Sequence, residues 1–307
     1  MALQTAAEIR ALIARHKRWD VIFGLIGILC LAIGLLTFAT LFVDMLLDGY
    51  TRLKPEFFTE FPSRRAGQAG ILSAWNGTTM EMNVTAVVAV PIGVAAGIYL
   101  EEYAPSNWMT DVIEINISNL AGVPSIVYGL LALGLFVYQF GLGQSVATAG
   151  LTLALLILPV VIVATREAIR AIPGAIREAA YALGGTKWQV VQGHIVPHST
   201  GGILTGVIIG MARAIGETAP IITIGALTFI AFLPPSPVTT EFPFLSFEWL
   251  MSPFTVMPIQ IFNWTSRPDP AFQANAAAAG FILVFMTLAM NGLAIWLRYR
   301  IRRNIKW

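Results

Sequence analysis

The sequence predicts an all-α, polytopic membrane protein with six transmembrane helices. Of its 307 residues, 56% are hydrophobic and only 12% are charged, whereas about 25% of the residues in a soluble domain are charged. Long stretches without a charged residue recur along the chain. Water cannot solvate such stretches, so we expect the lipid bilayer to surround them.

The uncharged stretches define the expected spans. Val21–Val43 and Met82–Leu100 each match the ~20 residues that one helix needs to cross the bilayer core. Ile115–Thr165 is long enough for two helices and a turn, which we place at residues 141–145 (GLGQS), where glycine and polar residues cluster. The last two spans are expected at about 202–230 and about 274–296.

Trp249–Ser266 is also uncharged, but we do not expect it to span the membrane. It contains Pro253 and Pro258 together with polar side chains, and a seventh span would move the basic C-terminus to the opposite side. We expect an interfacial segment instead, with Trp249 and Trp264 at the membrane interface or facing a partner protein.

Basic residues indicate the direction in which the chain crosses. Six spans place both termini on one side, and most basic residues lie on that side, whereas the other side carries only Arg52, Lys54, Arg64, Arg65 and Arg267. The positive-inside rule then makes both termini cytoplasmic and the loop at 231–273 periplasmic. The expected organisation is a cytoplasmic segment (1–20) and one transmembrane domain (21–307), with its first helix at 21–47 and five core helices at about 79–299.

A polar stretch, EAAYALGGTKWQVVQGHIVP at residues 178–197, interrupts the apolar sequence. Pro173 favours a helix start just before it, and Gly184 permits the left-handed turn that ends this helix. Thr186 and Gln189 have the spacing of a capping box that opens a second helix. These residues alone leave open whether the first helix packs on its own protein or docks a partner.

Five residues of this stretch match the EAA loop of ABC importer permeases: Glu178, Ala179, Ala180, Gly184 and Pro197. The chain resembles that family here, although His194 stands where an apolar residue is usual, three positions before the proline. The resemblance implies that residues 166–200 form a cytoplasmic coupling loop, whose short helix sits in a cleft of a separate ATPase subunit.

Four further segments resemble the A-type permease subunit of the phosphate-specific transport system. They are GIYLEEYAP (97–105), GVPSIVYGLLALG (122–134), ARAIGETAP (212–220) and MPIQIFNWTSRP (257–268). The resemblance implies a type I, MetI-like permease fold in the bacterial inner membrane, with inorganic phosphate as the substrate. It also implies two copies of an ATP-binding subunit, a second permease subunit of the C type and a periplasmic phosphate-binding protein.

Enzymatic chemistry has no recognisable signature in the sequence. Walker A, H-E-x-x-H and G-x-S-x-G patterns are all missing, so ATP hydrolysis is expected on another polypeptide. Cys30 is the only cysteine, so the chain offers no cysteine cluster for a metal, and we expect no metal or other cofactor. We also expect no nucleic-acid partner. A permease for sulfate, molybdate or an organic solute remains an alternative, although ARAIGETAP favours phosphate. A non-ABC channel is a further alternative, but a coupling loop would have no purpose in it.

Arg213 and Glu217 are charged residues inside the expected fifth span. Counted from residue 202, Arg213 lies about 16 Å along the helix, near the centre of a ~30 Å core. Glu217 follows on the same face and can form an ion pair with it. The pair either only locks the helices together or lines the pathway, where Arg213 would offer a fixed cation to phosphate. Together with Thr218 of the same GETAP segment, these residues are the candidate translocation site.

Overall fold

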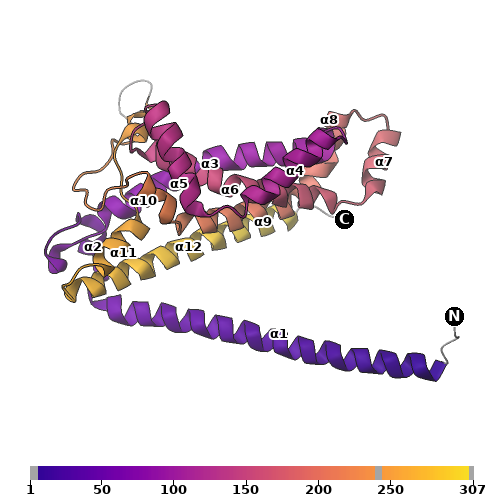
Figure 1. Ribbon diagram of the computed structural model, residues 1–307, viewed down its shortest axis with the longest axis horizontal. Helices are drawn as coiled ribbons and strands as arrows, with labels where there is room; N and C mark the ends of the chain where they lie inside the picture. Colours follow the sequence, from indigo (N-terminus) through magenta and orange to yellow (C-terminus); the bar gives the residue numbers. More distant parts are fainter. Residues whose placement is uncertain (1–5, 239–243, 304–307) are drawn as a thin grey trace.

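The computed structural model describes residues 6–238 and 244–303, which are almost entirely helical (Figure 1). Residues 239–243 of the predicted loop, and the two chain ends, therefore lie outside the described residues. An isolated bridge between Val238 and Leu245 is the only β-type pairing in the described part, and the all-α prediction is confirmed. In chain order the elements are α1 (Ala6–Gly49), η1 (Tyr50–Arg52), α2 (Pro55–Thr59), η2 (Ala66–Gln68), α3 (Leu72–Ile98), η3 (Tyr99–Tyr103), α4 (Trp108–Leu120), α5 (Ser125–Ala132), η4 (Leu133–Gln139), α6 (Val146–Arg170), α7 (Gly174–Ala182), α8 (Lys187–Val190), η5 (Val191–Ile195), α9 (Val196–Ile215), α10 (Ala219–Thr223), η6 (Glu248–Met251), α11 (Met257–Thr265) and α12 (Ala271–Arg303).

Five of the described helical segments are long and apolar enough to cross a membrane, and a sixth span is broken. The five are His16–Arg52, Leu72–Tyr103, Val146–Arg170, Lys187–Ile215 and Ala271–Arg300. The expected third span is instead α4 followed by α5 and η4, and the two parts meet at 105° (Figure 1). Pro124 lies at this corner and disfavours helical geometry at the residue before it, which explains the break. Six spans are present only if this bent pair counts as one.

The turn expected at residues 141–145 is confirmed. Gly141 and Gly143 have φ of +67° and +64°, in the left-handed region that glycine enters without steric cost. The Ser145 side chain then caps α6 by accepting a hydrogen bond from the backbone N–H of Thr148.

The fifth span is displaced from its predicted position. One continuous helical segment runs from Lys187 to Ile215, so the second helix of the polar stretch is the beginning of the span and not a separate element. The π-helical turn η5 precedes Pro197, which has no N–H to donate to the preceding turn. The helix ends at Gly216 rather than near 230, because α10 then begins afresh with Pro220 in its first turn.

The bundle is centred on α6, whose apolar stretch is mostly buried. α3 packs along it through Gly93 and Gly97: a Cβ on Gly93 would lie 2.7 Å from Val161, and one on Gly97 would lie 2.6 Å from Thr165. α9 also approaches α6 closely, through Gly202 at Ala168 and Gly206 at Ala164. Such small residues allow helix backbones to approach closely in membrane proteins, where packing rather than hydrophobicity drives association.

The segment Trp249–Ser266 differs from its prediction. As expected, it does not span: it contains α11, which is too short to cross a bilayer. Trp264, however, is completely buried and not at the interface. It packs with Phe57 and Phe272 in a cluster that joins α2, α11 and α12. Met257, Ile259 and Trp264 of α11 are thus buried inside the chain, while Phe262 is exposed and Trp249 is half-buried.

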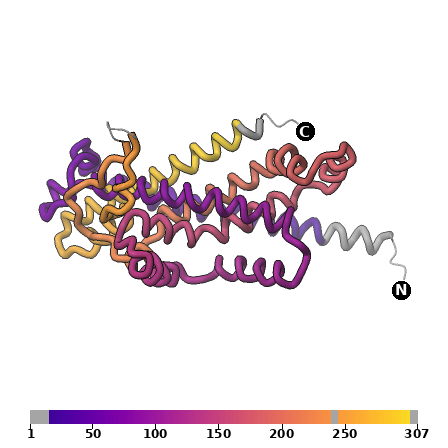
Figure 2. The backbone as a smooth tube through the Cα atoms, turned by 90° about the horizontal axis from the view of Figure 1, so that it is seen from above, coloured from indigo at the N-terminus to yellow at the C-terminus, as the bar shows by residue number. Residues whose placement is uncertain are grey.

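α1 lies apart from the bundle except near its C-terminal end (Figure 1). There the ring of Phe42 packs against that of Phe281 of α12, tilted by 34° with the ring centroids 4.7 Å apart, and Gly49 meets the backbone of Ala278. The helix starts at Ala6, well before the predicted 21–47, so the expected N-terminal segment is largely helical. The start of α1 and the end of α12 lie at the same end of the molecule as α7, while residues 50–71 and 244–270 gather at the opposite end (Figure 2).

Candidate functional site

The polar stretch begins within a short helix, α7, that projects from the bundle at one end of the molecule (Figure 1). It continues through α8 and η5 into α9. Pro173 precedes the first residue of α7, as predicted. Gly184 ends it with φ of +81°, and its N–H bonds to the carbonyl of Tyr181. Thr186 and Gln189 form the expected capping box at the start of α8.

The end of α7 and the start of α8 together form an outer face with exposed apolar side chains. Leu183 is 90% exposed and Trp188 63% exposed, and Tyr181 lies beside them on the surface. Glu178 and Ala179 of the EAA pattern are also exposed. Exposed apolar groups at a polar end of a protein mark a contact surface. The sequence pattern did not single out Trp188 and Tyr181, because exposure depends on how α7 is packed.

The two alanines of the EAA pattern differ, because Ala179 is exposed and Ala180 is buried. Ala180 is buried together with the apolar residues that join α7 to the bundle. The cluster consists of Ile169, Ile172, Ala180, Val190, Val191 and Ile195. Ala180 therefore allows close packing within the chain, whereas Ala179 remains available to a partner. Pro197 is half-buried in the first turn of α9, and His194 is exposed on η5.

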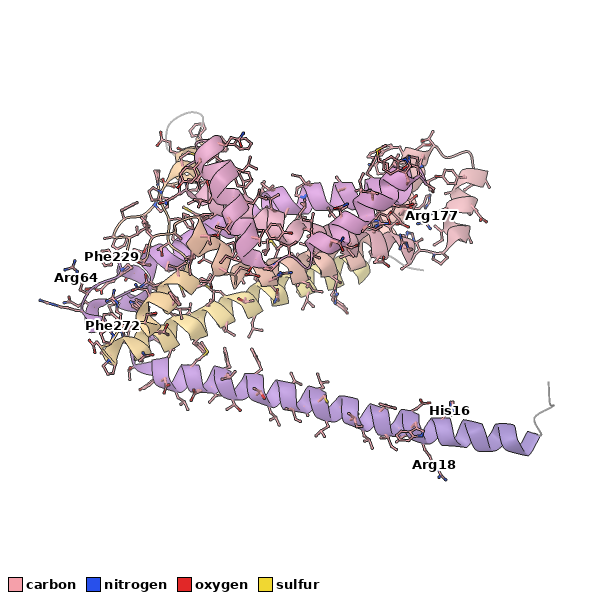
Figure 3. The ribbon with its side chains drawn as sticks, viewed as in Figure 1. His16, Arg18, Arg64, Arg177, Phe229 and Phe272 are labelled. Carbon is pink, nitrogen blue, oxygen red and sulfur yellow. The ribbon has the colours of Figure 1, made fainter. Side chains whose placement is uncertain are left out.

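Ion pairs join the elements around the base of α7, the part of this helix at Arg177 that meets the bundle. The sequence pattern did not predict them. Arg177 of α7 binds Glu102 of η3, with a shortest N–O distance of 2.8 Å. Arg166 lies 2.5 Å from Glu114 and 3.5 Å from Glu101, with its side chain 9% exposed. These charges come from distant parts of the chain, so only the fold brings them together. Figure 3 places Arg177 beside α7, at the opposite end of the molecule from Arg64 and Phe272.

Arg213 and Glu217 form the ion pair that their spacing predicts, with 3.3 Å between Nε and Oε1. The expectation of a charged pair inside one helix is wrong, however, because α9 ends between the two residues. Arg213 occupies the last turn, where a cation also stabilises the helix dipole. Its side chain is 39% exposed and that of Glu217 is 18% exposed. Thr218, half-buried, precedes α10 and accepts a backbone hydrogen bond from Ile222.

Metal chemistry finds no support in the part of the chain that the structure describes. No group of three or more His, Cys, Asp or Glu residues there could hold a metal ion. One of the two regions exposes apolar side chains, and the other presents a guanidinium and a carboxylate.

Residues 89–307 match the family described as "Binding-protein-dependent transport system inner membrane component". The chain belongs to this family of membrane permeases. A probable ABC transporter permease protein of Bacillus subtilis (strain 168), YqgI, is 31% identical over 92% of this chain and 95% of its own length. The "Phosphate transport system permease protein PstA" of Yersinia pestis is 34% identical over 77% of this chain and 75% of its own length.

Solved structures of ABC transporters share the permease fold. An inward-facing MetNI methionine transporter superposes with a TM-score of 0.54 at 14% identity, covering 75% of this chain and 95% of that one. A bacterial transporter involved in import of the polysaccharide alginate superposes with a TM-score of 0.61 at 13% identity, covering 96% of this chain and 100% of that one. The MetI-like membrane architecture predicted from the sequence is thereby confirmed.

Proposed function

We propose that this permease is the A-type transmembrane subunit of an ATP-driven importer of inorganic phosphate. The observation that carries the proposal is the 34% identity with the Yersinia pestis PstA protein. Other phosphate transport permeases, such as that of Pasteurella multocida, are 32% identical over 87% of this chain. Sulfate, molybdate and organic solutes remain the competing substrates for a permease of this family.

We infer that α7 is the coupling helix that docks on a separate ATPase. The outer face at the end of α7 and the start of α8 combines apolar Leu183 and Trp188 with the carboxylate of Glu178, which suits a partly apolar cleft with a basic residue at its edge. The end that carries α7, together with the start of α1 and the end of α12, is then cytoplasmic. The whole importer would contain two ATPase copies, a second, C-type permease subunit and a periplasmic phosphate-binding protein.

Arg213, Glu217 and Thr218 form the proposed contact with phosphate on the pathway. The partly exposed guanidinium of Arg213 offers forked donors that fit phosphate oxygens. Glu217 occupies one side of that guanidinium and keeps the attraction weak, which a transporter requires in order to release its substrate. The GETAP segment that holds these residues lies against the bent α5: Gly129 packs directly on Pro220.

ATPase stimulation tests the function. The complex purified in detergent, with its ATPase and binding protein, is expected to hydrolyse ATP faster when the binding protein carries phosphate. Binding protein offered sulfate or molybdate is the matched control and is expected to leave the basal rate unchanged. Stimulation by sulfate or molybdate but not by phosphate would overturn the substrate assignment and leave the permease assignment standing.

A further inference from the structure

The base of α7 contains a guanidinium that joins three elements. Arg177 donates from Nε and Nη2 to Oε1 of Glu102, at 3.1 and 2.8 Å. It also donates from Nη1 to the carbonyl of Ile172 at 2.9 Å and from Nη2 to the carbonyl of Ile169 at 3.1 Å. Arg177 belongs to α7, Ile169 to the last turn of α6, and Glu102 to η3 at the end of α3.

This contact is largely withdrawn from water. The side chain of Glu102 is 7% exposed and that of Arg177 is 23% exposed. A charge-assisted hydrogen bond with a planar fork fixes direction as well as distance, and low exposure strengthens it. By contrast, the Arg170–Glu167 pair, at 3.3 Å, joins side chains that are 52% and 63% exposed, and such a pair constrains little. Arg170 itself also binds Glu101 of η3, at 3.0 and 3.2 Å.

The remaining attachments of α7 are less directional. α7 makes its larger helix contacts with α8 and η5, and the apolar cluster around Ala180 contributes the rest. Apolar packing tolerates small rotations, whereas a forked guanidinium held by a carboxylate and two carbonyls does not. Within the described residues, the Arg177–Glu102 pair joins α7 directly to η3 at the end of α3.

α3 is suited to carry a displacement into the membrane. It runs from Leu72 to Ile98, and η3 continues it without a break to Glu102 and Tyr103. It packs along α6 at the close contacts of Gly93 and Gly97. A shift applied at Glu102 thus reaches the contact between α3 and the central helix of the bundle, as in the small sliding motions of packed helices.

We propose that the Arg177–Glu102 ion pair is the positioning link that transmits movement of α7 to α3, so that ATP hydrolysis drives transport. This inference rests on the proposed function of α7 as the coupling helix. Loss of the link leaves α7 able to dock on the ATPase, since the outer face with Leu183 and Trp188 is unaltered. ATP is then hydrolysed with less phosphate moved for each ATP consumed.

The test measures phosphate imported per ATP hydrolysed in proteoliposomes that contain the complete importer. Glu102→Ala removes the acceptor and leaves Arg177 on its two carbonyls. We expect the ratio to fall about fivefold or more, the lower range of couplings between two sites in proteins. Glu167→Ala removes the neighbouring exposed pair without touching α7, and it is expected to keep the wild-type ratio.

Three outcomes separate the possibilities. A Glu102→Ala importer with the ratio of Glu167→Ala would overturn the link. If Glu102→Ala does not assemble, Glu102→Met, which keeps the length but offers no oxygen acceptor to Arg177, is measured instead, and a wild-type ratio would equally overturn the link. A wild-type complex that hydrolyses ATP without importing phosphate would defeat the proposed function rather than the link alone.

Discussion

Replacing Arg213 by glutamine tests the proposed translocation site most sharply. Glutamine is polar and of similar length but uncharged, so the change removes the cation and little bulk. The ion pair with Glu217 is partly exposed, at 39% and 18% for the two side chains, and pairs of this kind contribute about 0.2–1 kcal/mol to stability. The variant should therefore fold and assemble. A charge-assisted hydrogen bond to a passing anion contributes about 1.5–3 kcal/mol, and its loss corresponds to roughly a 10- to 150-fold lower uptake rate.

The assay is uptake of labelled phosphate at matched membrane levels of each variant. Arg298→Gln is the matched control, because it also removes a guanidinium bonded to α9, at Thr205, away from the candidate site. It is expected to retain uptake. The double change Arg213→Gln with Glu217→Gln decides between the two roles. It stays inactive if Arg213 serves the substrate, and it recovers if the charges only balance each other. Recovery of uptake in the double variant would refute the reasoning.

Three further predictions follow from the fold. Gly184→Leu forces a side chain into a backbone with φ of +81°, at a cost of about 1–2 kcal/mol, and should reduce co-purification of the ATPase. Gly184→Asn should not reduce it, because asparagine tolerates this backbone conformation. Equal recovery of the ATPase with both variants would contradict the docking assignment. Gly97→Leu would place its Cβ 2.6 Å from Thr165 and should lower the midpoint of thermal unfolding, while Gly134→Leu, which has open space around it, should not; unchanged midpoints for both would mean that α3 and α6 pack less closely than described. In a Cys30→Ala background, Gln68→Cys and Gln192→Cys, both at exposed positions, should react with an impermeant thiol reagent from opposite sides of the membrane, and reaction from one side would refute the topology.

Local backbone chemistry was the part of the fold that the sequence predicted well. The left-handed turn at Gly184 and the capping box of Thr186 and Gln189 depend on neighbours in the chain, and both were found. The apolar runs likewise located the first, second, fourth and last spans. The end of α9 at Gly216 was missed because a run of apolar residues continues beyond it, and hydropathy does not register a helix break.

Features that depend on tertiary contacts could not be predicted from the sequence. Trp264 has the composition of an interfacial aromatic residue, and only packing against Phe57 and Phe272 explains its burial. Ala179 and Ala180 are equivalent in the sequence, yet one is exposed and the other buried. The Arg177–Glu102 pair joins residues that are far apart in the chain, so no local spacing of residues predicts it.

Transport itself is the most direct test of the central claim that this permease imports phosphate. The purified importer is reconstituted into proteoliposomes with ATP on the side of α7 and with the loaded binding protein on the other side. If the permease imports phosphate, labelled phosphate accumulates inside the vesicles only when ATP is present, and excess sulfate does not suppress this accumulation. Accumulation that is independent of ATP, or that excess sulfate abolishes while labelled sulfate enters instead, would contradict the claim.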